Sequence, residues 1–389
     1  MTSTTRGAGR VLGWDKIRLN QIKKATGSRA LLPFCAKEFV QVPVSPRIDT
    51  LPLADPARED APAPIAVRRI GSVHVGGRSA SLQGLPARQI VYSPGGPAVD
   101  LDPNGQFQIE QMYAQFVQLQ EPRAHHPLLL MHGGGMCGVT YETTPDGRSG
   151  WQEVFLRAGH DVWIADALER GRASWARSPE FFAGEPVFRP MHEAWELFRI
   201  GPPGSWHAHA QQRQPHARTR FPVHAFETFM KQAMPRWTSN DVATAAAYGE
   251  LARLHGPFVL VAHSQGCNFA WTMALAHPQQ VRAIVAIEPS GFPQVDDAAL
   301  APLRGIPQLM VWGDHLDGHP LWSQLRPRLR AFAQRLRQCG AHVDDWDLPA
   351  LGVHGNSHML MMDDNSEDLA LRIHRWLADQ GLMVQATQP

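Results

Sequence analysis

The chain has 389 residues, of which 43% are hydrophobic and 19% charged, as in a folded globular protein and unlike a disordered or fibrous one. Its 37 Lys and Arg nearly equal its 36 Asp and Glu, so no overall field favours nucleic acid or an anionic membrane. The apolar stretches have the length of strands, too short to span a bilayer. We therefore expect a small-molecule substrate. The four cysteines are far apart, which favours free thiols over a disulfide scaffold or zinc module.

Residues 1–65 are expected to form a basic, proline-rich extension. The first forty residues contain eight Lys or Arg and two acidic residues, a composition that suits either a solvated arm or a targeting peptide. We favour the arm, because the apolar segment at residues 30–36 is short and interrupted by a proline, unlike the centre of a secretory signal. Residues 41–65 are proline-rich and aperiodic, as in an extended linker. A cytoplasmic location is expected on the same grounds.

The rest of the chain predicts an α/β fold with a mostly parallel central sheet flanked by helices. Segments rich in β-formers come first, bounded by Gly and Pro, and suggest an antiparallel entry to the sheet at residues 66–75, 87–93 and 107–119. Short apolar runs alternating with helical stretches follow, the pattern of a parallel sheet covered on both faces. The predicted buried strands are residues 127–131, 160–165, 258–262, 282–287, 307–312 and 341–348. The predicted helices are residues 150–158, 268–276, 327–338 and 366–378.

Residues 168–240 interrupt this alternation with a long segment rich in aromatic residues, His and Pro. Loops of that length inside a compact domain are usually lids or binding segments. We therefore predict a cap or lid over the active site, and a catalytic core made of residues 66–167 and 241–389. The cap aromatics suit an apolar pocket wall, although packing of the cap onto the core is the default explanation for any one of them.

The strongest chemical motif is AHSQG at residues 262–266, which follows an apolar strand and precedes a helix. Such a turn needs small residues beside the serine, lifts its hydroxyl into a pocket and presents the helix N-terminus to developing negative charge. Ala262 replaces the usual first glycine and is also small. The motif predicts Ser264 as the nucleophile; a serine that merely caps a helix is the alternative.

A glycine-rich turn, HGGG at residues 132–135, follows the predicted strand at residues 127–131. Acyl transfer requires two N–H donors aimed at the oxyanion, one from the residue after the nucleophile and one from the loop after the third strand. We expect these donors to be Gln265 and Gly134, with Gly135 as the alternate for the second. A glycine turn needed only for close packing is the competing explanation.

The general base is predicted to be His358, in the loop GNSH at residues 355–358. This loop follows the last predicted strand and precedes a helix, where an acyl-transfer fold of this order delivers its base. The chain has 19 histidines, so position carries the argument. His354 is the competitor and suits either the pocket wall or the solvent-exposed surface.

The acid that orients the base has three candidates. Glu288 follows the strand at residues 282–287, whereas Asp314 and Asp317 follow the next strand, the commoner location for such an acid. A carboxylate that emerges directly from a buried strand is costly without a partner such as an imidazole, which favours Glu288. Asp314 stays open as the alternative.

At these residues the chain resembles the α/β-hydrolase superfamily, from about residue 107 to the C-terminus. The segments HGGGMCGVTYETTPDGRSGW, AHSQG, IEPSG and GNSHMLMMDDN are similar to a small group of bacterial carboxylesterases that use a Ser/Glu/His triad with the acid after the sixth strand. In that group the Glu lies 24 residues beyond the Ser, as Glu288 does here. The resemblance implies an α/β-hydrolase fold and a triad of Ser264, Glu288 and His358. It also implies that residues 140–151 support the oxyanion loop.

The expected activity is hydrolysis of a small carboxylic ester through an acyl-enzyme on Ser264. An amidase, a lactonase or an acyltransferase would use the same residues, and a non-catalytic binding protein would be expected to lack one of them. No metal or organic cofactor is expected, because no HExxH or comparable ligand spacing occurs and the histidines of residues 207–216 are irregularly spaced. The sequence is compatible with a homodimer and does not decide the oligomeric state.

Overall fold

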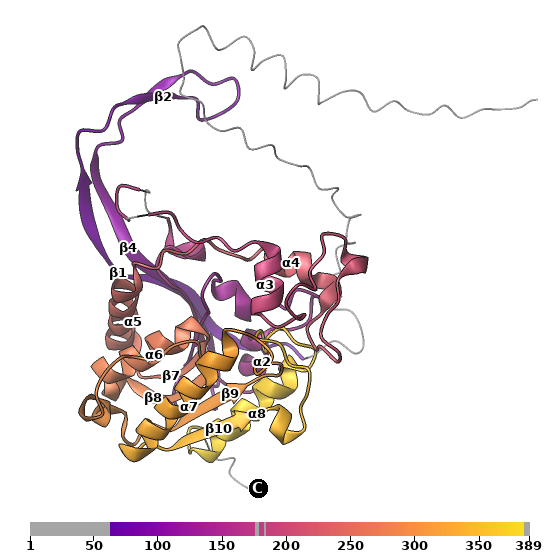
Figure 1. Ribbon diagram of the computed structural model, residues 1–389. Helices are drawn as coiled ribbons and strands as arrows, with labels where there is room; N and C mark the ends of the chain where they lie inside the picture. The colour runs from indigo at the N-terminus through magenta and orange to yellow at the C-terminus, as the bar shows by residue number, and fades with distance from the viewer. Residues whose placement is uncertain (1–62, 176–178, 183, 385–389) are drawn as a thin grey trace, which may run out of the picture. The chain divides into compact units, whose positions relative to one another are not determined.

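The computed structural model describes residues 63–175, 179–182 and 184–384 (Figure 1). All of these residues belong to one compact unit. The extension predicted over residues 1–65 therefore lies outside the described residues except for its last three.

An eight-stranded sheet forms the centre of this unit, in the order β1-β4-β6-β5-β7-β8-β9-β10. The first two strands enter antiparallel and β4 also pairs antiparallel with β6, whereas all later pairs are parallel. Strands β5, β6, β7 and β9 are buried along their whole length, as expected where helices cover both faces. The predicted fold class is confirmed. The strands are β1 (Val67–Leu82), β4 (Gly105–Leu119), β5 (Leu128–Met131), β6 (Val162–Asp166), β7 (Phe258–His263), β8 (Val281–Ile287), β9 (Gln308–Trp312) and β10 (Val343–Asp347).

Strands β1 and β4 form a long hairpin that projects from the sheet in Figure 1. They are paired from Val67↔Leu119 to Leu82↔Gly105, but β4 meets β6 only from Tyr113 to Val117. Among the described residues, no third strand therefore pairs with the outer part of the hairpin. Near its end β2 (Arg88–Ile90) and β3 (Val99–Leu101) form a separate two-stranded sheet. The strand predicted at residues 87–93 is thus short and does not join the main sheet.

Helices cover the two faces of the sheet and enclose two hydrophobic clusters. One cluster takes side chains from α5 (Asp241–His255), α6 (Gln265–Ala276) and α7 (Trp322–Gln338), and the other from α2 (Trp151–Arg157) and α8 (Ser366–Asp379). Helix α5 was not among the predicted helices. Helices α6 and α7 begin earlier than predicted, α6 because it starts directly after the turn at Ser264 and α7 because Pro327 lies inside it and does not mark its start.

The segment predicted as a cap carries two short helices, α3 (Met191–Leu197) and α4 (Phe226–Met230). Buried aromatic side chains from both helices, such as Trp195 and Phe226, belong to the same hydrophobic cluster as α2 and α8. Figure 1 shows α3 and α4 close together on this side of the molecule. For these aromatics, packing onto the core is therefore the structural role that is observed.

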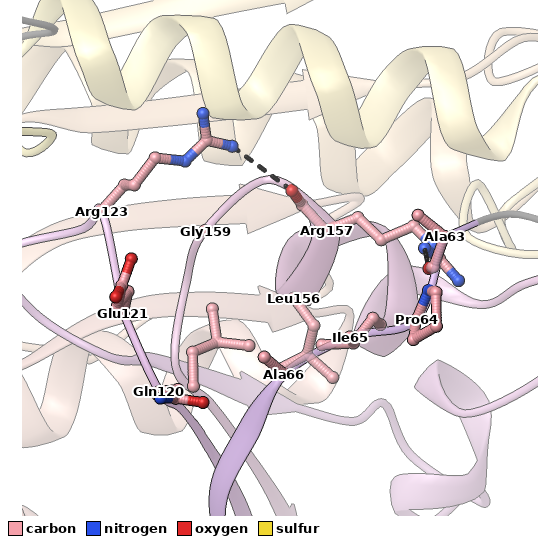
Figure 2. A pocket seen from close by; sticks show the side chains of 11 residues that line it. Ala63, Pro64, Ile65, Ala66, Gln120, Glu121, Arg123, Leu156, Arg157 and Gly159 are labelled. Carbon is pink, nitrogen blue, oxygen red and sulfur yellow. Dashed lines mark hydrogen bonds between the residues drawn. The ribbon is translucent and has the colours of Figure 1, made fainter.

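A pocket of about 490 Å³ lies between the first described residues, the end of β4 and α2 (Figure 2). Arg157 donates to the carbonyl oxygen of Ala63 over 2.6 Å, and Arg123 donates to the carbonyl oxygen of Arg157 over 3.3 Å. The lining includes Leu156 and Gly159 but none of the residues predicted to be catalytic. This pocket is therefore separate from the predicted catalytic residues.

Candidate active site

Ser264 stands alone between β7, which ends at His263, and α6, which begins at Gln265. Its backbone has φ +53° and ψ −115°, a conformation that is strained for any residue but Gly and that persists only where the surroundings hold it. Here its N–H donates to the carbonyl oxygen of Ile287 over 2.9 Å. A Cβ at Gly266 would lie 2.7 Å from two backbone carbonyl oxygens. The local sequence therefore produces a tight strand-to-helix turn with Ser264 at its apex.

A pocket of about 150 Å³ opens beside this serine. The structure places His358 in its lining together with Ser264, Gln265, Gly134 and the alternate donor Gly135. The Ser264 hydroxyl donates to Oγ of a neighbouring serine, Ser290, over 3.3 Å.

Glu288 completes this group from the turn after β8. Its Oε2 atom lies 3.1 Å from Nδ1 of His358, and both side chains are fully or almost fully buried. Like Ser264, Glu288 has a positive φ, +48°. All five predicted site residues, Ser264, Glu288, His358, Gly134 and Gln265, therefore lie in this pocket or in contact with its lining.

The competing acids and the competing base lie differently. Asp314 accepts hydrogen bonds from the backbone N–H groups of Gly355 and His315, over 2.9 and 2.8 Å. His354 is half exposed, with Nδ1 3.7 Å from Asp314. Asp317 is exposed and 3.5 Å from a guanidinium of α7. Only Glu288, among these three carboxylates, contacts the imidazole of His358.

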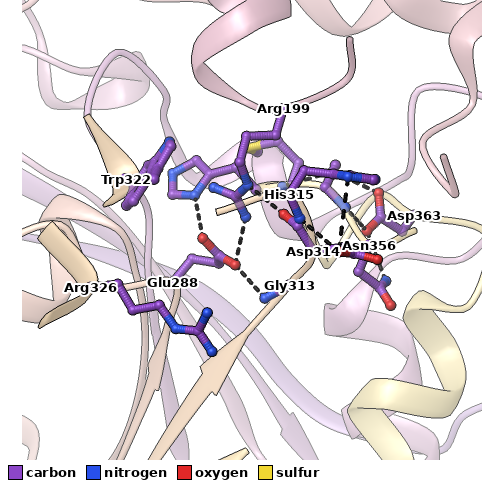
Figure 3. Close-up of polar contacts among 12 residues, drawn as sticks. Arg199, Glu288, Gly313, Asp314, His315, Trp322, Arg326, Asn356 and Asp363 are labelled. Carbon is purple, nitrogen blue, oxygen red and sulfur yellow. Dashed lines mark hydrogen bonds and ion pairs between the residues drawn. The ribbon is translucent and has the colours of Figure 1, made fainter. Parts of the chain in front are cut away.

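Arg199, from the segment predicted as a cap, binds the carboxylate oxygen of Glu288 that His358 does not contact. Its Nη2 atom lies 2.7 Å from Oε1 of Glu288, and neither side chain is exposed. Its Nε donates to the carbonyl oxygen of Asp314 over 2.7 Å, and the guanidinium lies 5.0 Å from the ring centre of Trp322 (Figure 3). The N–H of Gly313 makes a further short hydrogen bond to the same carboxylate. Glu288 is thus held by three donors.

These contacts set the ionisation states of Glu288 and His358. Burial by itself would raise the pKa of Glu288, but the charge of Arg199 and the hydrogen bonds from His358 and Gly313 together hold the pKa below its ordinary value. Burial lowers the pKa of His358, and Glu288 offsets only part of that effect. The imidazole is therefore neutral near pH 7, which is the form that a general base requires.

Two hydrogen bonds to the backbone of His358 and two aromatic rings position this residue. Its backbone N–H donates to the carbonyl oxygen of Phe198 over 2.8 Å, and its carbonyl oxygen lies 3.0 Å from Nε2 of His263. The Phe198 ring is stacked with the imidazole at 5.6 Å, and the Trp322 ring lies at 4.5 Å. The stacking of Phe198 on His358 could not be predicted from the sequence, because the two residues lie far apart along the chain.

The loop that carries His358 is braced by Asp363 and Arg148. Asp363 is fully buried and accepts hydrogen bonds from Ser357 N–H, from Ser357 Oγ and from Asn356 Nδ2, over 2.7–2.9 Å. Arg148 donates to the carbonyl oxygens of Asp363 and Met362 over 2.9 and 2.8 Å. The stretch at residues 140–151 therefore supports the histidine loop, in addition to the hydrogen bond from Tyr141 to Met131 at the base of the oxyanion loop.

In the part of the chain that the structure describes, no group of three or more His, Cys, Asp or Glu side chains is arranged to hold a metal ion. His216, from the histidine-rich run, stacks on His315 at 3.9 Å instead. Within the same described ranges, no helix is both long and apolar enough to cross a membrane.

Comparison with known proteins assigns the chain to a family. Residues 126–345 match the family described as the alpha/beta hydrolase fold, and the protein belongs to that family. A solved structure titled as a novel bacterial esterase is 32% identical, with a TM-score of 0.69, and the match covers 82% of this chain and 98% of the esterase. A "Probable secreted lipase phiG" from Fungal sp. (strain ATCC 74256) is 24% identical over 337 residues, 71% of this chain and 88% of the lipase.

The protein is accordingly a hydrolase of the carboxylesterase type. One expectation is wrong: the cytoplasmic location is contradicted by the similarity to a relative that is named as secreted. The basic N-terminal composition on which that expectation depended lies outside the described residues and does not determine the compartment.

Proposed function

We propose that this enzyme hydrolyses small carboxylic esters through an acyl-enzyme on Ser264. The observation that carries the proposal is the strained turn at Ser264, which shares a pocket with His358, while His358 contacts a charged and fully buried Glu288. Buried charges are costly unless they are paired. The Arg199, Glu288 and His358 cluster is therefore best explained by the chemistry that it supports.

In the proposed mechanism, His358 removes the proton from the Ser264 hydroxyl as its oxygen attacks the ester carbonyl carbon. The backbone N–H groups of Gln265 and Gly134 bind the oxyanion of the tetrahedral intermediate. The intermediate collapses, and His358 gives its proton to the departing alcohol. A water molecule then attacks the acyl-enzyme by the same route and releases the acid. Glu288 stays ionised throughout and stabilises the imidazolium.

The pocket volume of about 150 Å³ is suited to a short acyl or alcohol group. Its apolar lining includes Leu197, Phe198 and Trp322. The first two of these come from the segment of residues 168–240, which supports the proposal that this segment acts as a cap over a core formed by residues 66–167 and 241–389. From the secreted relative we also propose an extracellular location.

The test is labelling with a small fluorophosphonate, followed by peptide mapping and by turnover of p-nitrophenyl esters of increasing acyl length. Wild type is compared with Ser264→Ala and with Ser290→Ala, which removes the serine hydroxyl that bonds to Ser264. The proposal predicts one adduct on Ser264, lost only in Ser264→Ala, and turnover that falls as the acyl chain outgrows the pocket. Labelling of Ser290, or labelling that survives in Ser264→Ala, would overturn it.

A further inference from the structure

Arg236, like Arg189, comes from residues 168–240 and lines the pocket beside Ser264. Its Nε atom is buried and has no hydrogen-bond partner among the described residues. The carboxylate that attracts it most is Asp241, which is itself bonded to the side-chain amide of Gln265 over 3.0 Å. Burial lowers the pKa of Arg236, and the attraction of Asp241 does not make up the difference. The guanidinium is thus partly desolvated without a matched anion.

The backbone holds this guanidinium against the predicted oxyanion loop. Arg236 and Val187 exchange two backbone hydrogen bonds, of 2.8 and 3.0 Å, and the N–H of Met234 donates to the carbonyl oxygen of Gly135 over 2.8 Å. A Cβ placed on Gly134 would lie only 2.8 Å from Nη1 of Arg236. The cation therefore lies directly over one of the glycines expected to bind the substrate carbonyl oxygen.

Further positive charge surrounds Arg236. Arg189 lines the same pocket and has a half-exposed ion pair of 2.9 Å with Glu193. Arg170 is buried, and burial together with the charge of Arg236 lowers its pKa to about 10. Arg170 does not line the pocket, and Asp241 attracts both Arg170 and Arg236. Cations in or beside a partly desolvated pocket are costly unless enough negative charge joins them. The side of the pocket that Arg189 and Arg236 line is therefore suited to bind a negatively charged group.

We propose that the natural substrate is a small ester that also carries a free carboxylate, and that Arg236 binds this carboxylate. The planar fork of a guanidinium matches a carboxylate with two parallel hydrogen bonds. Arg236 is less suited to bind only the oxyanion. Two backbone N–H groups are already expected to bind the oxyanion, and the pocket has more than one arginine. The substrate class is then half-esters of dicarboxylic acids and acyl derivatives of hydroxy acids. This inference rests on the proposed esterase function.

The test compares two pairs of esters that differ only in a carboxylate and its neutral isostere. Monomethyl succinate is paired with methyl isohexanoate, and acetoxyacetate with isobutyl acetate, so that the charge is on the acyl side in one pair and on the alcohol side in the other. Acid release is titrated at constant pH for wild type, Arg236→Met and Arg236→Lys. Arg372→Gln, which removes an exposed arginine of α8, is the matched control.

Wild type should prefer the anionic member of at least one pair. Arg236→Met should reduce that preference at least about 30-fold, because a charged partner in a desolvated site is lost. Arg236→Lys should fall between the two, and Arg372→Gln should keep the wild-type preference. An equal loss for both members of a pair would overturn the inference and assign Arg236 to the oxyanion.

A wild type that shows no preference for the anionic ester in either pair would also overturn the inference, and this result does not depend on whether the Arg236 variants fold. The proposed function fails in a different way. It is refuted if wild type turns over none of the four esters and the fluorophosphonate does not label Ser264, whereas the inference alone is refuted if neutral esters are turned over equally well.

Discussion

The core and the segment of residues 168–240 contribute different things to the same pocket. From the core come Ser264, Glu288 and His358, each in a turn or loop next to a strand of the sheet. From the segment come Arg199, which forms an ion pair with Glu288, and Arg236, whose Nε has no hydrogen-bond partner among the described residues. In the account proposed here, the core supplies the groups that react, and the segment supplies the charges that set their ionisation and select the substrate. Substitutions in the two regions should therefore differ in kind as well as in size.

The largest effect is expected in the core, at the base. His358→Ala should lower kcat by roughly 10⁵ to 10⁶, because serine hydrolases lose nearly all triad catalysis with their histidine. His354→Ala, at the half-exposed neighbour, should change kcat by less than about threefold, as for most surface sites away from the chemistry. Steady-state kinetics on one ester decides the matter, and similar losses in the two variants would exclude His358 as the base.

Glu288→Gln should lower kcat by about 10⁴, as in serine proteases where the acid is replaced by its amide and the imidazole tautomer is wrong. The matched variant is Asp314→Asn, which changes a carboxylate just after the next strand, β9, that bonds to backbone N–H groups and not to His358. Its loss should stay below about tenfold. If Asp314→Asn were the more damaging variant, the acid would have to be reassigned.

The third prediction tests whether Arg199 sets the pKa values of Glu288 and His358 or only contributes to packing. Arg199→Met removes the cation that pairs with a fully buried carboxylate and should cost about 3–5 kcal/mol of unfolding free energy. Loss of its charge should also raise the pKa of both Glu288 and His358, since Arg199 lowers both. The acid limb of the kcat/KM profile should therefore move to higher pH.

Arg213→Met is the control for this change. Arg213 is also buried, pairs with Glu227 and lies 4.1 Å from the ring centre of Trp206, away from His358. Thermal or urea unfolding should show destabilisation of both variants, while only Arg199→Met moves the pH profile. A shift of the same size in Arg213→Met would reduce the role of Arg199 to packing.

The smallest effect concerns the wild-type pH profile. Burial lowers the pKa of His358, so the imidazole stays neutral, and able to accept the Ser264 proton, below the ordinary histidine pKa of about 6.5. As pH falls through the lowered value, the imidazole becomes protonated and kcat/KM should decline. The midpoint of that acid limb should lie below about 6.5; a midpoint well above it would mean that another group controls activity.

Much of the core could be predicted from the sequence because its signals are local. Each buried strand is a short apolar run, and the turn at Ser264 is encoded by the small residues beside it. Helix boundaries were less well predicted, since α7 begins at Trp322 and contains Pro327. The short sheet of β2 and β3 was not predicted either, because it depends on pairing between segments with little apolar pattern.

The segment of residues 168–240 could not be predicted at the same level. Arg199 meets Glu288 across 89 positions of sequence, and Arg236 acquires its significance only from lying over Gly134. Neither arginine belongs to a pattern with a recognisable period or motif. Their roles arise from long-range contacts, and a sequence that contains many arginines does not show which ones are buried beside a carboxylate or left without one.

The most direct test of the account is a crystal structure of the enzyme inhibited by a small phosphonate that carries a carboxylate. The account predicts a bond from phosphorus to Oγ of Ser264, the phosphonyl oxygen within hydrogen-bond distance of the N–H groups of Gln265 and Gly134, and the carboxylate paired with Arg236. An adduct on another residue, or a phosphonyl oxygen that faces away from these donors, would contradict the assignment of the reacting groups. A carboxylate that turns away from Arg236 would contradict the role given to residues 168–240 in selecting the substrate.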